Sequence, residues 1–180
     1  MKNGIRSSAC SLFIGIMAAA IASGADRGEK IVSKYTSTAR KNAISYQVHK
    51  GEGGEADGFE GVFPGLGGYQ LLHLSGDERS WINIRYGQTI QDLYVATMEA
   101  AGGTFPNKDN DVVEWRGVER NGQFVPFAII YRVRAGNDET RQVHTRLIVI
   151  KLDKKQSRVL GHAQGKNEDA EAKQIADRAR

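Results

Sequence analysis

The second half of the chain is a succession of strand-like segments joined by short turns, with no crossover helix between them. Gly122 and the sequence Gly136-Asn137-Asp138 mark the first two turns. Strands joined this closely pair antiparallel, because a parallel pair needs a connection of about a dozen residues or more. Apolar residues predict these strands over 112–119, 124–134, 143–152 and 157–165.

The first half adds further strands. Residues 43–50 alternate apolar and polar side chains, as a half-buried strand does. Residues 69–74 and 80–86 flank the polar sequence Ser75-Gly76-Asp77-Glu78 and are typical of a hairpin. Between these strands, residues 51–68 hold eight of the 21 glycines. Because glycine is costly to order, we interpret 51–58 as a loop and 61–68 as a tight bend.

Two segments have helical spacing. Residues 89–101 carry an apolar stripe and end at Gly102-Gly103. Residues 168–178 begin with acidic side chains and end near Arg178, which suits the helix dipole. The order of elements predicts an α+β fold, with one curved, mainly antiparallel sheet of about six to eight strands and two helices.

The N-terminus is typical of a secretory signal peptide. Lys2 and Arg6 precede an apolar stretch over residues 12–22, and small residues follow it. Cleavage is expected after Ala22 or Ala25, and an uncleaved amphipathic anchor is the alternative. The stretch is too short for a membrane span, which needs about 20 apolar residues. We therefore expect a periplasmic or secreted protein that meets the membrane only through its signal peptide during export.

The expected organisation is a signal peptide (1–25), a flexible N-terminal arm (26–42) and a single α+β domain (43–180). Ile31, Val32 and Tyr35 within the arm also allow a short strand. Cleavage after residue 25 leaves 23 basic and 21 acidic residues, a net charge of +2. So balanced a charge gives no reason to expect a nucleic-acid partner.

The usual catalytic patterns are missing from the sequence. The only cysteine, Cys10, lies in the signal peptide, and there is no Gly-x-Ser-x-Gly elbow or Ser-x-x-Lys pair. The four histidines fall on different expected strands, so no metal site or cofactor is predicted. His73, Ser75 and Asp77 alternate like a compressed triad, but a turn explains them better. We assign no catalytic residue.

Arginines on the expected strands are the remaining candidates for a site. Glu114 and Arg116 share one face of their strand, whereas Val113 and Trp115 share the other. If the arginines of neighbouring strands align, they form a basic strip for an acidic or carbohydrate ligand. Cross-strand ion pairing on a solvated sheet face is the alternative. The candidate ligand-binding residues are Arg85, Glu114, Arg116 and Arg132.

Several short motifs together resemble a group of small exported alphaproteobacterial proteins of unknown function. They are Gly76-Asp77-Glu78-Arg79, Tyr86-Gly87, Val113-Glu114-Trp115-Arg116, the segment 126–132 (PFAIIYR) and the closing Asn167…Ala170…Ile175-Ala176-Asp177. The resemblance covers about residues 61–178 and implies a Gram-negative periplasm. Members often have a cysteine before the Pro-Gly turn and another near the last strand. This chain has Phe63 and Val159 in those regions and no such cysteines.

Three functional hypotheses follow from these patterns. The leading one is a non-enzymatic exported domain that binds a small ligand or a periplasmic protein. The second is a periplasmic hydrolase that uses Glu114 or Asp77 with an arginine. The third is an exported enzyme inhibitor, for which residues 51–60 supply the only candidate for a protruding loop.

Overall fold

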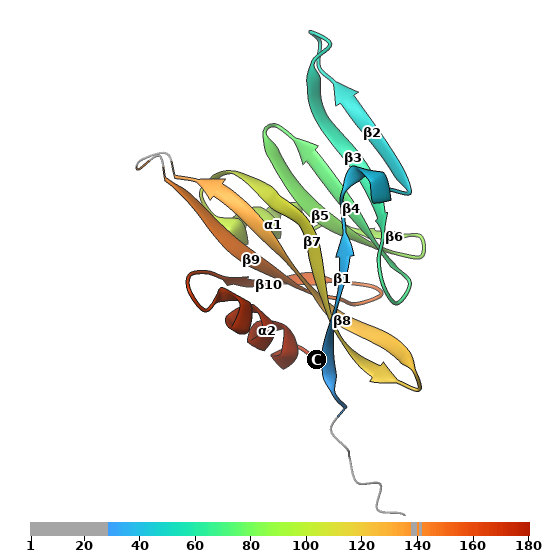
Figure 1. Cartoon of the computed structure of the whole chain (residues 1–180). Helices are drawn as coiled ribbons and strands as arrows, with labels where there is room; N and C mark the ends of the chain where they lie inside the picture. The colour runs from blue at the N-terminus through green and yellow to red at the C-terminus, as the bar shows by residue number, and fades with distance from the viewer. Residues whose placement is uncertain (1–28, 138–139, 141) are drawn as a thin grey trace, which may run out of the picture.

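The computed structural model describes residues 29–137, 140 and 142–180, so the predicted signal peptide lies outside the described residues. Within them, strands dominate and two α-helices interrupt the order (Figure 1). The elements are β1 (Ile31–Ser37), the 3₁₀ turn η1 (Arg40–Asn42), β2 (Ser45–Lys50), β3 (Ala56–Pro64), β4 (Tyr69–Gly76), β5 (Arg79–Tyr86), β6 (Thr89–Gln91), α1 (Tyr94–Ala101), β7 (Thr104–Arg120), β8 (Gln123–Gly136), β9 (Val143–Lys151), β10 (Arg158–Ala163) and α2 (Glu168–Arg178).

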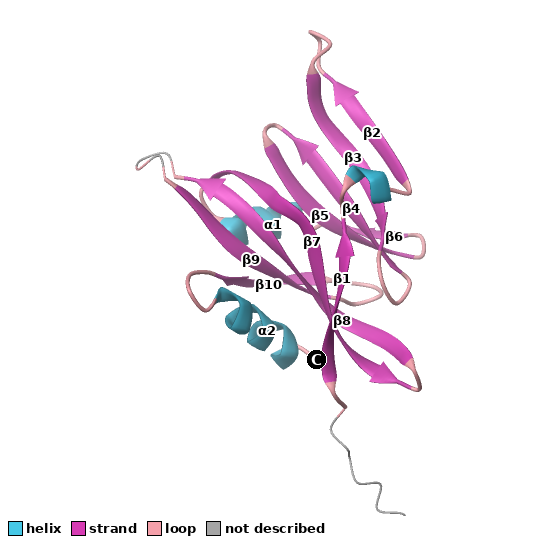
Figure 2. Ribbon diagram, in the orientation of Figure 1, coloured by secondary structure: helices cyan, strands magenta, loops and turns pink. Residues whose placement is uncertain are grey.

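The strands form two antiparallel sheets, which corrects the single sheet expected from the sequence. Sheet A has the strand order β1-β7-β8-β9-β10, and sheet B has the order β2-β3-β4-β5-β6. Each has five strands, and all their pairings are antiparallel. The antiparallel character and the two helices are as predicted (Figure 2). The chain passes from sheet B back to sheet A through α1, which follows β6.

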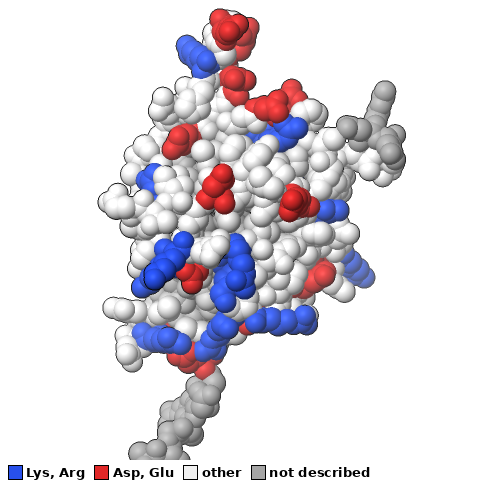
Figure 3. All heavy atoms as spheres, turned by 180° about the vertical axis from the view of Figure 1, so that it is seen from behind, with Lys and Arg blue, Asp and Glu red and all other residues white. Residues whose placement is uncertain are grey.

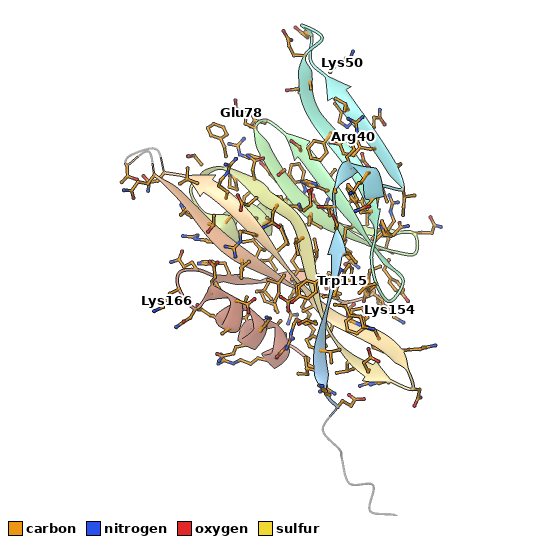
Figure 4. The ribbon with its side chains drawn as sticks, viewed as in Figure 1. Arg40, Lys50, Glu78, Trp115, Lys154 and Lys166 are labelled. Atoms are coloured by element: carbon orange, nitrogen blue, oxygen red, sulfur yellow. The ribbon has the colours of Figure 1, made fainter. Side chains whose placement is uncertain are left out.

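Sheet B packs on one face of sheet A, and their shared core holds the largest buried side chains. Trp115 of β7 is fully buried there (Figure 4), and its indole nitrogen donates a 2.8 Å hydrogen bond to Thr36 Oγ1 of β1. Sheet B contributes Phe63, Leu71, Ile82 and Ile84; sheet A contributes Val113, Ile129, Tyr131, Val133, Ile148 and Ile150.

The opposite face of sheet A is covered by α2 (Figure 1). Ala172 and Ala176 of α2 are completely buried, and small side chains at these positions let the helix approach the sheet closely. Beneath them lie Ala128, Ile130, Leu147, Val149 and Ala163. Strands β8 and β9 therefore bury alternate side chains in two different cores.

Strand β3 falls where the sequence predicted a loop and a bend. It pairs with β2 on one side and β4 on the other, with Gly58 opposite Gly76 and Gly61 opposite His73. Glycine is required here for space. A Cβ at Gly58 would lie 2.2 Å from the Ser75 carbonyl oxygen, and one at Gly61 would lie 2.6 Å from the Phe63 ring. The expected hairpin over 69–86 is confirmed, with positive φ at Asp77 and Glu78 in its two-residue turn.

Within the expected arm, the alternative of a short strand is confirmed, since residues 31–37 form β1, which pairs with β7 from Ile31–Val118 to Ser37–Val112. The expected boundary at residue 43 therefore separates strands of one fold. The helix expected over 89–101 begins only at Tyr94, because residues 89–91 pair with β5. The Gln91 amide joins both sheets: its nitrogen donates to the Asp153 carbonyl and its oxygen accepts from Ser157 N–H.

The paired glycines of β3 and β4 give a matched stability test. Gly58→Ala should lower the free energy of unfolding by about 2 kcal/mol, because the new methyl group overlaps backbone that cannot rotate away. Gly76→Ala, at the directly opposite position, has open space and should be neutral or stabilising by roughly 0.5 kcal/mol. Urea unfolding of both variants measures the difference. Equal destabilisation would show that the close approach at Gly58 is not the cause.

Candidate functional site

A groove with a volume of ≈ 630 Å³ lies on sheet B. Its lining comes from β2, β3, β4 and the β4–β5 turn, namely Tyr46, Val48, Ala56, Asp57, Gly58, Phe59, Ser75, Asp77 and Glu78. Ligand pockets commonly enclose about 300–1,000 Å³, so the groove has the size of a binding site. We call it the hairpin groove, because the β2–β3 hairpin forms one side of it.

The floor of the hairpin groove continues the core-facing surface of sheet B. Tyr46 stands in register with Gly61, His73 and the buried Ile82, so these four share one face. Val48 belongs to the same face two residues further along β2, but 41% of it is exposed. The face that packs against sheet A is therefore uncovered toward the tip of the hairpin.

Aromatic side chains order this floor. The Tyr46 and Phe59 rings stack with centroids 5.2 Å apart, and the Phe59 and His73 rings form a T-shaped pair with centroids 4.8 Å apart. The Arg40 guanidinium of η1 lies over Tyr46, 4.7 Å from the ring centroid. Stacking and cation–π contacts of this kind hold the rings in place, so the floor is formed without a ligand.

The rim of the groove is acidic. Asp57 lies beside the hairpin tip, and Asp77 and Glu78 form the neighbouring β4–β5 turn. Arg79 pairs with Asp77 and partly offsets its charge. Figure 4 shows Glu78 at this turn and Lys50 near the hairpin tip. From behind, acidic side chains gather at the hairpin end and most basic ones lie in the lower half (Figure 3).

Two basic groups lie behind the floor, the half-buried His73 and the buried side chain of Lys108. His73 Nε2 is buried without a hydrogen-bond partner, and burial, aided by the charge of Lys108, lowers the pKa of His73 to about 3. Lys108 has a side chain only 1% exposed, with Nζ 3.5 Å from Asp111 Oδ1. Burial lowers the Lys108 pKa, and Asp111 opposes that shift. His73 is therefore neutral at pH 7.

Two of the predicted ligand-binding residues instead fasten α2 to sheet A. Arg116 donates from Nε to Asp177 Oδ1 at 3.0 Å and from Nη2 to Asp177 Oδ2 at 2.6 Å, a bidentate pair. Its Nη1 also donates to Ser33 Oγ at 2.6 Å. Glu114 is buried and accepts a 2.5 Å hydrogen bond from Ser33, with Lys173 Nζ at 3.8 Å. Both side chains thus have partners on β1 and α2.

The other two candidates are separated from each other. Arg132 faces α2, where Nη1 donates to Glu168 Oε1 at 2.5 Å. Glu114 and Arg132 also line a smaller hollow of ≈ 180 Å³ beside α2. Arg85 lies in sheet B and makes one long contact, 3.4 Å from Nη1 to Gln70 Oε1. The four residues therefore do not form one basic strip, and cross-element ion pairing accounts for Arg116 and Arg132.

The carboxylates considered for a hydrolase are also apart. Glu114 faces α2 from sheet A, whereas Asp77 lies in a turn of sheet B. His73 and Ser75 share the groove face, but Asp77 bonds Arg79 instead of standing behind the imidazole. Among the described residues, no group of three or more His, Cys, Asp or Glu side chains is placed to hold a metal ion.

Sequence reasoning missed the floor of the hairpin groove. The strand containing Tyr46 and Val48 was predicted, but its neighbour β3 was hidden by glycines. The available signal was the alternation of Phe59, Gly61 and Phe63, which places two rings on one face with a gap between them. Read as a strand, this pattern brings Phe59 beside Tyr46 and Val48.

Comparisons with protein-family models, with curated proteins and with solved structures found no match. Over the residues that the structure describes, neither α1 nor α2 has the length and apolar character to cross a bilayer.

The half-buried His73, whose Nε2 is inaccessible to water, predicts a specific acid sensitivity. The unfolded chain takes up a proton at the ordinary pKa of 6.5, whereas the folded protein resists protonation down to about 3. Stability is therefore lost as the pH falls from 6.5 toward 3, and His73 accounts for about 2 kcal/mol of the loss between pH 7 and 5. His73→Phe should remove that part. Urea unfolding at both pH values measures it, and an unchanged pH dependence would contradict the assignment.

The pairing of Arg116 predicts a structural role. Arg116→Gln should lower the free energy of unfolding by about 2 kcal/mol, because it leaves Asp177 and Glu114 without their guanidinium. Arg85→Gln should lower the free energy of unfolding by less than about 1 kcal/mol, since the hydrogen bond from Arg85 to Gln70 is long. Thermal unfolding of the two variants provides the measurement. Equal losses would contradict the helix-fastening role of Arg116.

Proposed function

We propose that this protein is an exported, non-enzymatic binding domain and that the hairpin groove is its binding site. The observation that carries the proposal is an ordered aromatic floor on a sheet face that continues the core but remains open. Exposing such a surface is costly, and apolar surface of this kind commonly marks a binding site.

We propose that the protein is located in the periplasm. It is supported by the signal-like pattern of residues 1–25 and by the resemblance to exported alphaproteobacterial proteins. A binding domain in this compartment takes its ligand from the periplasmic fluid or from another exported protein. The small net charge of the cleaved chain gives no support to a nucleic-acid partner.

The hydrolase hypothesis has less support. General acid–base chemistry by two carboxylates needs both in one cleft. Glu114 and Asp77 lie on different sheets, and Glu114 is held by Ser33 and the charges of α2. The inhibitor hypothesis retains one supporting observation, since the β2–β3 hairpin projects from the body of the fold (Figure 1).

A ligand screen with a groove-blocking variant tests the proposal. The protein is expressed as the full chain, purified in the form the cell accumulates, and screened by thermal shift against sugars, organic acids, amines, nucleotides and short peptides. A ligand at about 100 times its Kd adds about 2.7 kcal/mol, which raises Tm by roughly 5–10 °C for a protein of this size. Val48→Lys, which extends a charged chain over the floor, should abolish that shift.

The matched control is Val143→Lys, an exposed strand valine in sheet A. It should keep the ligand-induced shift of the original protein. A shift that survives Val48→Lys would place the binding site elsewhere. Turnover of any screened compound that is lost with Glu114→Gln or Asp77→Asn would support the hydrolase instead.

A further inference from the structure

Each sheet has two edge strands, and they differ in how well they are protected. In sheet B, β6 is only three residues long. In sheet A, β10 is interrupted by a bulge between Val159 and Gly161, and β1 carries Lys34 in its middle. Short length, bulges and central lysines are the devices that keep edges from pairing with other chains.

Strand β2 lacks these devices over most of its length. It keeps regular pairing with β3 from Ser45 to His49, and its single lysine, Lys50, is its last residue. All of its residues except Tyr46 are exposed. Because β2 is the outermost strand of sheet B among residues 29–137, 140 and 142–180, its outer edge presents backbone donors and acceptors that pair with no strand of the described part of the chain.

The open β2 edge and the hairpin groove are one continuous surface, since Tyr46 and Val48 belong to both. A strand added beside β2 would lie about 4.8 Å away, and every second side chain would point over Val48 into the groove. A lysine or arginine there is long enough to cross the floor toward Asp57 on β3.

The charges around this surface favour a basic partner. Asp57, Asp77 and Glu78 border the groove. Two nearby arginines already have partners, since Arg79 pairs with Asp77 and Arg40 lies over the Tyr46 ring. Lys50, at the end of the strand, and Lys108, whose side chain is buried behind the floor, are positive charges that oppose a cation there. An acidic rim attracts a cationic segment and raises its association rate.

We propose that the β2 edge and the hairpin groove bind an extended, basic segment of a partner polypeptide by strand addition. Backbone pairing along β2 supplies affinity, and alternate lysine or arginine and apolar side chains enter the groove. This inference rests on the proposed function and names the ligand class of the same site.

The test uses a nine-residue peptide in which threonine alternates with lysine or valine, titrated into the purified protein by calorimetry. We expect saturable one-to-one binding that weakens as salt is raised. The same peptide with glutamate for lysine should not bind measurably. Two further versions are N-methylated at one or the other set of alternate residues, and the version whose methyl groups face β2 should lose about tenfold or more in affinity.

Variants of the protein separate charge from backbone pairing. Asp57→Asn combined with Glu78→Gln should lower the affinity for the lysine peptide at least several-fold and reduce the dependence of that affinity on salt. Glu171→Gln, an exposed substitution on α2, is the control and should leave the affinity unchanged.

The possible failures are distinguishable. If spermidine binds as tightly as the lysine peptide, or if both N-methylated peptides bind normally, strand addition is wrong although the groove still binds a cation. If no peptide binds while a screened compound gives a shift that Val48→Lys abolishes, this inference fails and the proposed function stands. If neither peptide nor compound binds at the groove, both are overturned.

Discussion

The architecture depends on the burial of both faces of β8 and β9. Ile129 and Tyr131 point to one side of β8, and Ala128 and Ile130 point to the other, with all four nearly inaccessible to water. A sheet of this composition needs two covers, because either face left open would expose several large apolar side chains. Sheet B provides one cover and α2 the other. This arrangement also explains the position of the hairpin groove, because the groove lies on the part of sheet B that extends beyond the area in contact with sheet A.

The elements with strong local patterns were predictable. The strands over 124–134, 143–152 and 157–165, the hairpin over 69–86 and the helix over 168–178 are close to their expected places, whereas β7 begins at Thr104, eight residues before the expected start. The division into two sheets was not predictable, because antiparallel strands have the same sequence pattern whichever sheet they join. Strand β3 was missed because Gly58 and Gly61 lower strand propensity, and the space that they provide is visible only once Ser75 and Phe63 are in place.

In the predicted site, ion pairs with a distant helix give the charged side chains a structural role. Arg116 and Glu114 are on one face of their strand as expected, but that face receives α2, which brings Asp177 and Lys173 to meet them. A helix separated from β7 by about fifty residues cannot be placed there by strand periodicity alone. The hairpin groove, in contrast, owes its character to Tyr46 and Phe59, whose stacking depends on a β2–β3 register that the glycine-rich segment concealed.

The pairing of β1 has a consequence for the order in which the chain folds. Strands β2 to β6 and strands β7 to β10 each pair with neighbours in sequence, so both groups form from local contacts. Strand β1 is the exception, since Ser33 meets Arg116 more than eighty residues later. It is synthesised before the other described strands, yet it has no place in a sheet until β7 exists. Long-range closure of this kind slows folding, and the earliest of the described strands is thus among the last to dock.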